Sequence, residues 1–282
     1  MYDYLCTDLS VEHPAFRLLG RYPDRLVSYP IQSLSHHPGR CLFLSDHAQH
    51  VEQARMLGFG TLLVDETCSE QTLLPYLSWV DPPVCASHTL FMFDLGNVVI
   101  KNITMLGKIA RRYELDREAF FQDYLHYEFP LMEGVVSSAV YWDHVYHQFG
   151  IQVEGDPFFD AFDPIPNEEM LHLIKRLRSE GKRVVCASNT IDPHWKKMEA
   201  MGILSLFDAT YASHKLALTK PSERFFTTIL ERERVDREAV YFIDDYELNI
   251  EHARKLGLAS LLYADGIGLT ASERLAEAFG ER

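Results

Sequence analysis

The chain has 282 residues, 47% of them hydrophobic, which is enough for one large or two modest domains with a proper core. Its 41 acidic residues outnumber its 27 basic residues, and the net charge of −14 disfavours nucleic acid as a partner. Five scattered cysteines without CxxC spacing predict neither a disulfide framework nor a zinc site. The N-terminus lacks the basic residues of a signal peptide, and no apolar run is long enough to span a membrane. We therefore predict a cytoplasmic protein with no membrane contact.

Residues 1–88 are predicted to form an N-terminal α/β segment. Within it, Arg40–Glu66 reads as strand, helix and strand, and it aligns without a gap to Ala239–Asp265 at an offset of 199 residues. Nine of the 27 aligned positions are identical, so the segment looks like a partial, non-catalytic copy of the end of the chain. The alternative is that a shared helix-to-strand packing, written AR-LG in both stretches, explains the match. No nucleophile strand is predicted to precede this copy.

The copy is not expected to form a second active site. The offset aligns Ser45–Asp46 with Asp244–Asp245, and Arg21 with Lys220. Pro30, however, would interrupt the helix expected after Arg21.

The sequence LFMFDLGNVVI, Leu90–Ile100, places one carboxylate, Asp94, within an apolar run. A charge in a strand buried on both faces is costly unless it lies at the end of the strand with partners. We therefore expect Asp94 at the carboxyl end of a buried strand.

Residues 103–163 are predicted to be a helical insert without a convincing strand. Asp116 can cap one helix, and Ser137 or Ser138 can cap another that ends at Gly150. Most polar and aromatic side chains of the insert are expected to pack or face solvent, because Trp142 and its neighbours recur at helical spacing. The candidates for contact with a substrate are His126, Tyr127, Glu128, Glu133, Trp142 and His147.

Helix and strand alternate from residue 164 to the end of the chain. Asn167 opens an amphipathic helix, and strands are expected at 183–187, 209–213, 240–243 and 260–264. Further helices are expected at 193–201, from Pro221, at 247–256 and at 271–279. This alternation predicts an α/β fold with a parallel sheet, formed by residues 89–102 and 164–282.

Four short motifs, FDLGNV, ASNT, TKP and FIDD, fall at predicted strand or helix ends, where an open parallel sheet forms its crevice. In this order they resemble the four motifs of the haloacid dehalogenase-like superfamily, whose members are mostly phosphatases. The resemblance covers about Thr89 to Ala264. It is greatest to a branch with sugar-1-phosphate phosphatases and the phosphatase domain of soluble epoxide hydrolases. It implies a Rossmann-like core, with residues 103–163 as the cap and residues 1–88 as a partial repeat of that core.

The resemblance implies that Asp94 attacks phosphorus and forms an aspartyl-phosphate, which water then hydrolyses. It implies that Asp94, the carbonyl of Gly96 and Asp245 hold Mg²⁺, a hard cation that prefers oxygen ligands. Asp244 is expected beside the metal site, behind these ligands.

The resemblance also assigns the phosphate-binding groups. Ser188 and the backbone of Asn189 would donate hydrogen bonds to the phosphoryl oxygens, and Lys220 would neutralise charge on them and on Asp94. Taken singly, Ser188 and Asn189 could cap a helix and Lys220 could be a solvated lysine. The four motifs together favour a site.

Gly96 departs from the family pattern, because phosphatases of the superfamily usually have a second aspartate there, as the general acid. Its loss slows the reaction without removing the other contributions. Glu128, Glu133 and His194 are candidate replacements.

We therefore predict a Mg²⁺-dependent phosphatase of a small phosphorylated metabolite, with sugar phosphates among the candidates. The alternative is a weak or inactive relative that binds a phosphometabolite or a protein partner.

Overall fold

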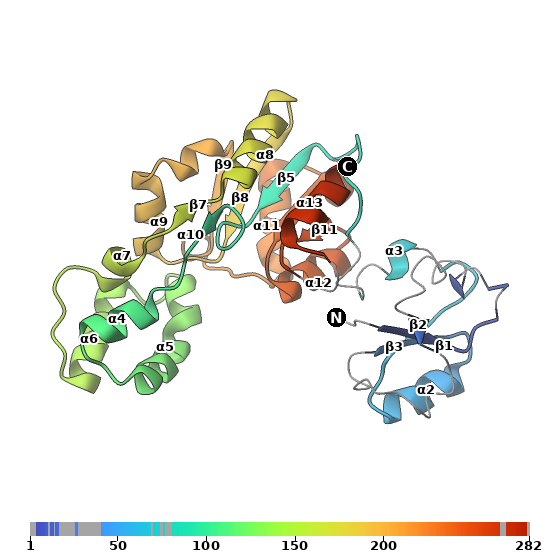
Figure 1. Ribbon diagram of the computed structural model, residues 1–282, viewed down its shortest axis with the longest axis horizontal. Coiled ribbons are helices and arrows are strands. Elements are labelled where there is room, and N and C mark those ends of the chain that lie inside the picture. The colour runs from blue at the N-terminus through green and yellow to red at the C-terminus, as the bar shows by residue number, and fades with distance from the viewer. Residues whose placement is uncertain are drawn as a thin grey trace.

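The computed structural model describes residues 4–10, 12–13, 15–16, 26–27, 41–68, 70–73, 76, 81–265 and 269–280. It shows an α/β protein with two parallel sheets and one short antiparallel pair of strands (Figure 1). The fold class predicted from the sequence is confirmed. Among the described helices, none is both long and apolar enough to cross a membrane.

The larger sheet has the strand order β11-β10-β5-β8-β9, with all neighbours parallel. Its strands are β5 (Leu90–Phe93), β8 (Arg183–Ser188), β9 (Ala209–Ala212), β10 (Val240–Asp244) and β11 (Ala259–Leu262). Two hydrophobic clusters contain residues of this sheet, and the side chains of β5 contribute to them alternately. Phe91 and Phe93 belong to one cluster, and Leu90 and Met92 belong to the other. The central strands β10, β5 and β8 are therefore buried on both faces, which explains why they are mainly apolar runs.

The helices around this sheet follow the predicted alternation. They are α8 (Glu168–Ser179), α9 (Asp192–Ala200), α10 (Ser213–Leu216), α11 (Glu223–Glu233), α12 (Glu247–Lys255) and α13 (Ala271–Phe279), with 3₁₀ turns at Ile203–Leu206 and Arg237–Ala239. Asn167 precedes α8 as predicted, but its side chain does not cap the helix. It donates instead to the carbonyl of Val98 at 2.7 Å and to the hydroxyl of Tyr263 at 3.1 Å. This buried amide joins the start of α8 to the loop after β5.

The segment between β5 and α8 forms a helical group with its own hydrophobic cluster. Its helices are α4 (Leu106–Arg112), α5 (Arg117–Met132), α6 (Ser138–Phe149) and α7 (Pro157–Ala161). They lie together on one side of the larger sheet (Figure 1). Asp116 accepts a hydrogen bond from the N–H of Ala119, and Ser137 from that of Val140, so the two predicted caps are confirmed. The antiparallel pair β6 (Ile100–Lys101) and β7 (Ile165–Pro166) closes the base of the insert.

The smaller sheet has the order β2-β1-β3-β4, with parallel neighbours. Its strands are β1 (Tyr4–Thr7), β2 (Leu26–Val27), β3 (Cys41–Ser45) and β4 (Gly60–Leu63), accompanied by helices α2 (Ala48–Met56) and α3 (Glu70–Leu73). The bounds of β3, α2 and β4 coincide with those of β10, α12 and β11 at an offset of 199 residues. Gly58 and Gly257, which follow the two helices, both have positive φ, 87° and 91°.

The expectation that no nucleophile strand precedes the copy is wrong as to position, because β1 lies where β5 lies in the larger sheet. β1 pairs with β3 in the register in which β5 pairs with β10, so Asp8, after β1, corresponds to Asp94. The similarity of the two sheets thus extends beyond the aligned stretch. His50, which corresponds to Asn249, contacts Asp8 through Nδ1. Arg21 and Pro30 lie outside the described residues.

The residues directly before β5, from Asp81 to Val84, contact the larger sheet and its helices. Asp81 accepts hydrogen bonds from Arg254 Nη2 at 3.0 Å, Arg274 Nη1 at 2.8 Å and the N–H of Leu262 at 3.0 Å. All three charged side chains are at least 90% buried. The division into residues 1–88, 103–163 and the remaining core stays a prediction.

Candidate active site

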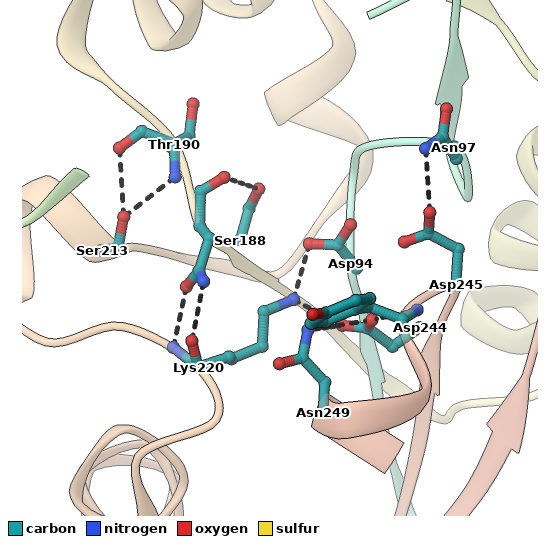
Figure 2. A network of polar contacts seen from close by, with 11 residues as sticks. Asp94, Asn97, Ser188, Thr190, Ser213, Lys220, Asp244, Asp245 and Asn249 are labelled. Carbon is teal, nitrogen blue, oxygen red and sulfur yellow. Dashed lines mark hydrogen bonds and ion pairs between the residues drawn. The ribbon is translucent and has the colours of Figure 1, made fainter. Parts of the chain in front are cut away.

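The candidate site lies where three neighbouring strands end. Asp94 follows β5, Ser188 ends β8 and Asp244 ends β10. Because these strands are parallel and adjacent, their carboxyl ends meet at one edge of the sheet. Lys220, in the loop before α11, reaches the same edge (Figure 2).

Lys220 lies between two carboxylates. Its Nζ donates to Asp94 Oδ1 and to Asp244 Oδ2, both at 2.6 Å. The lysine is 2% exposed, Asp244 is fully buried, and Asp94 is 7% exposed. Figure 2 shows the second oxygen of Asp94 pointing away from the lysine, and among the described residues nothing donates a hydrogen bond to it. Asp94 is thus anchored through one oxygen and available through the other.

The charges of this group explain its ionisation. Burial raises the pKa of Asp94 to about 7; Lys220 opposes the shift, whereas Asp244 and Asp245 add to it. Burial acts to lower the pKa of Lys220, but Asp244 and Asp94 outweigh it, so the pKa is raised. The two pKa shifts have one explanation. A single ammonium group lies between two buried carboxylates, so it is strongly stabilised in its charged form, while one negative charge of the carboxylates stays uncompensated. A second cation near Asp94 would favour its ionised form.

Asp244 is held by the protein on both oxygens. Oδ1 accepts from the N–H of Tyr246 at 2.9 Å and from Asn249 at 3.0 Å, and Oδ2 accepts from Asn249 at 3.1 Å and from Lys220. These contacts favour a positioning role over direct metal binding. Asn249, on the first turn of α12, was not predicted as a site residue.

Asp245 is the more accessible of the paired aspartates. It is partly exposed, and Oδ2 accepts from Asn97 Nδ2 at 2.8 Å. Asn97, in the FDLGNV motif, has a positive φ of 55°, a conformation that asparagine tolerates better than most residues. The side chain is a further positioning group, which its place in the motif could have indicated.

The oxygen atoms of Asp94 and Asp245 fit Mg²⁺. Within the part of the chain that the structure describes, no three histidine, cysteine or acidic side chains form a ligand cluster. Mg²⁺ needs fewer protein ligands, because one or two carboxylates suffice when waters and phosphate oxygens complete its coordination. Asp94 and Asp245 are close enough for the second carboxylate to raise the pKa of the first.

Asn189 fixes the loop that carries Lys220. Its Nδ2 donates to the carbonyl of Lys220 at 2.9 Å, and its Oδ1 accepts from the N–H of Lys220 at 2.8 Å. Ser188 is buried, and its hydroxyl makes one long contact of 3.4 Å with the carbonyl of Asn189. The Ser188 hydroxyl is thus weakly engaged, whereas the Asn189 side chain positions the lysine.

A cavity of about 390 Å³ adjoins the site and extends beneath α4 and α5. Its lining combines Gly96, Ser188 and Asn189 at the strand ends with mainly apolar residues of the insert and of α9. The members are Leu95, Gly96, Ile100, Ile103, Thr104, Met105, Leu106, Gly107, Arg117, Phe120, Phe121, Tyr124, Glu128, Met132, Phe162, Ser188, Asn189, Thr190, Ile191, His194 and Met198.

Only two of the three candidate residues for proton transfer line the cavity. Glu128 and His194 line it, whereas Glu133 accepts a hydrogen bond from Thr219 at 3.1 Å and lies outside the lining. Burial raises the pKa of Glu128. Burial lowers the pKa of His194 to about 3, and its ring stacks on Phe162 at 4.0 Å. His194 is therefore neutral near pH 7, and Glu128 is the better placed acid.

The other cap candidates do not line the cavity. His126 and His147 are exposed, and Tyr127 packs against Tyr141. Trp142 is buried in the cluster of the insert, where its Nε1 donates to Asp156. Packing thus explains Tyr127 and Trp142, as the helical spacing predicted.

Comparison with known proteins identifies relatives of the core. A sequence model of the family described as haloacid dehalogenase-like hydrolase matches residues 159–263. Sesquiterpene phosphatase astK of Aspergillus oryzae is 26% identical over 133 residues, covering 44% of this chain and 68% of that protein.

The search of solved structures also finds enzymes of the HAD family. HAD family enzyme bt-2542 of Bacteroides thetaiotaomicron is 26% identical, with a TM-score of 0.56, over 64% of this chain and 95% of that one. Its magnesium complex is 25% identical, with a TM-score of 0.55, over 65% and 96% of the chains. These findings support a hydrolase core of the haloacid dehalogenase-like superfamily. The branch with sugar-1-phosphate phosphatases stays a prediction.

Proposed function

We propose that this protein is a Mg²⁺-dependent phosphatase that hydrolyses phosphate monoesters through an aspartyl-phosphate. The observation that carries the proposal is the asymmetry of Asp94, with one oxygen held by Lys220 and the other without a hydrogen bond among the described residues. A nucleophile must be oriented and still have a free lone pair, and this arrangement provides both. The phosphatase among the relatives and the magnesium complex of a solved relative support the same conclusion.

In the proposed reaction, Asp94 Oδ2 attacks phosphorus, and the bond between phosphorus and the ester oxygen breaks. The leaving oxygen takes up a proton and departs as an alcohol. Water then attacks the phosphorus of the aspartyl-phosphate, which releases inorganic phosphate and restores Asp94. Ser188 and the Asn189 backbone donate to the phosphoryl oxygens, and Lys220 compensates their charge.

Asp94, the carbonyl of Gly96 and Asp245 would hold Mg²⁺. When bound, the ion supplies positive charge beside the phosphoryl oxygens and favours the ionised form of Asp94. Asp244 keeps Lys220 in place, and Asn97 orients Asp245.

Gly96 gives a specific reason to keep the weak or inactive alternative, because no carboxylic acid stands there to protonate the leaving group. Glu128 lines the same cavity as Gly96 and is the best placed candidate to replace that acid, and the dependence of the rate on the leaving group decides whether it does so. The cytoplasmic location stays a prediction.

Release of inorganic phosphate from a panel of phosphate monoesters tests the function. We expect turnover with Mg²⁺ and loss of turnover when a chelator is added. Phosphate release that is undiminished in the chelator would contradict the metal-dependent mechanism. No release from any ester with Mg²⁺ would favour the inactive alternative.

A further inference from the structure

We infer, resting on the phosphatase function proposed above, that the substrate is the phosphate monoester of an apolar alcohol. Its hydrocarbon part would occupy the cavity beneath α4 and α5, and its phosphate would lie at the strand ends. The protein would thus select lipophilic alcohols rather than sugars.

The position of the cavity supports this assignment. Gly96, Ser188 and Asn189 belong both to its lining and to the phosphate end of the site. A group attached to the phosphate therefore enters the cavity directly.

The chemistry of the lining is apolar over most of its area. Ile103, Met105 and Phe120 come from the insert and the loop before it, and Phe162 and Met198 also belong to the lining. A sugar would have to exchange its hydrogen bonds with water for contacts with these side chains, which costs free energy for each hydroxyl left unpaired. An alkyl or isoprenoid chain gains free energy from the same contacts.

The polar groups of the lining leave this apolar character intact. His194 is neutral, its ring packs on Phe162, and its Nε2 lies 2.8 Å from Met105 Sδ. Arg117 is exposed at the start of α5. Glu128 is the one carboxyl group in the lining, and burial favours its neutral form.

The volume of about 390 Å³ lies within the range of small-molecule pockets. Each methylene group that the cavity buries should strengthen binding about threefold to fourfold. Binding should therefore increase steadily with chain length until the cavity is filled.

Phe121 and Phe129 provide a matched pair of variants. Both are exposed phenylalanines of α5, 43% and 52% exposed, but only Phe121 lines the cavity. Because neither side chain belongs to the buried core, replacement by serine should leave the fold intact.

The test measures the dissociation constants of n-alkylphosphonates from ethyl to decyl, by calorimetry with Mg²⁺. Their carbon–phosphorus bond resists this hydrolysis, so the measurement does not depend on turnover. We expect affinity to rise about threefold per methylene over the first members. Phe121→Ser should weaken binding of decylphosphonate about tenfold and leave ethylphosphonate unchanged, whereas Phe129→Ser should change neither. Affinity that does not vary with chain length, or equal effects of the two variants, would overturn the inference.

Hydrolysis of decyl phosphate and glucose 6-phosphate, both esters of primary alcohols, is measured in parallel. A higher kcat/KM for decyl phosphate supports the inference, and a higher kcat/KM for glucose 6-phosphate contradicts it. If neither ester is hydrolysed, the proposed function fails for these esters, while phosphonate binding still decides the occupant of the cavity.

Discussion

Lys220 Nζ lies 2.6 Å from Asp94 Oδ1, and the second oxygen of Asp94 points away from the lysine. Asp94→Asn keeps the shape of the side chain but removes its negative charge, so it should abolish phosphate release while the protein stays folded. The checks are phosphate release and the thermal unfolding midpoint. A folded variant with undiminished turnover would exclude Asp94 as the nucleophile.

Metal affinity should depend on Asp245 and not on Asp46, although the two occupy corresponding positions of the two sheets. Asp245→Ala should raise the Mg²⁺ concentration for half-maximal activity by at least about tenfold, since it removes a carboxylate ligand. Asp46→Ala is the control, because Asp46 follows β3 of the smaller sheet, so its loss should leave the titration unchanged. Equal effects of the two changes would mean that both sheets contribute to one site.

The absence of an acid at Gly96 should make the rate sensitive to the leaving group. Aryl and anomeric phosphates have acidified leaving oxygens, so a plot of log rate against leaving-group pKa should have a steep negative slope. Gly96→Asp should flatten it. A Cβ at residue 96 would lie 3.1 Å from Ile103 Cδ1, the flexible end of a side chain, so the fold can adjust.

Gly96→Asn is the control for this experiment, since it adds similar bulk without a proton to donate. A flat plot for the natural protein would mean that another acid already acts. In that case Glu128→Gln should restore the slope.

Asp81 should contribute more to stability than an ordinary surface ion pair. Its carboxylate is shared by two buried guanidinium groups, those of Arg254 and Arg274. Asp81→Ala should therefore lower the free energy of unfolding by about 3 kcal/mol, as measured by urea denaturation. The control is Glu52→Ala. Glu52 pairs with exposed Arg55, the counterpart of Arg254, and its loss should cost less than about 1 kcal/mol. Similar losses in both variants would contradict the assigned role of the buried group.

His194 should make the protein less stable in acid. Its pKa is about 3 in the folded protein and about 6.5 when unfolded, so below pH 6.5 only the unfolded chain gains the proton. This contribution to stability is complete above pH 6.5 and decreases between pH 6.5 and about 3, by up to about 1.4 kcal/mol per pH unit.

His194→Leu should reduce the slope of unfolding free energy against pH between pH 7 and pH 5, as measured by urea denaturation. Replacement of the exposed His126 provides the comparison. If the two variants have the same slope, His194 is not the group responsible.

The central strands of the larger sheet could be predicted because burial on both faces requires mainly apolar runs, and those runs end at Asp94, Ser188 and Asp244. The helix caps at Asp116 and Ser137 were equally visible, since a capping side chain acts within its own turn. Buried strands and helix caps depend mainly on residues close together in the chain, so a short stretch of sequence is enough to predict them.

The remaining features depend on contacts between distant segments. β1 is four residues long and begins with tyrosine and ends with threonine, so its equivalence to β5 became evident only from its register with β3. Asn249 looked like any polar residue of a helix until the fold brought it to Asp244. The cavity combines α5, the loop after β5 and α9, and no single stretch reveals its apolar lining.

Because the two sheets have the same register, side chains at corresponding positions can be compared within one molecule. One backbone plan appears twice, with Asp94 beside an ammonium group in one instance and Asp8 beside the imidazole of His50 in the other. At corresponding positions Asp244 is replaced by Ser45, and Asn249 by His50. The two instances therefore separate the strands and the helix that the backbone plan requires, which both have, from the group of charged side chains around Asp94, which only one has.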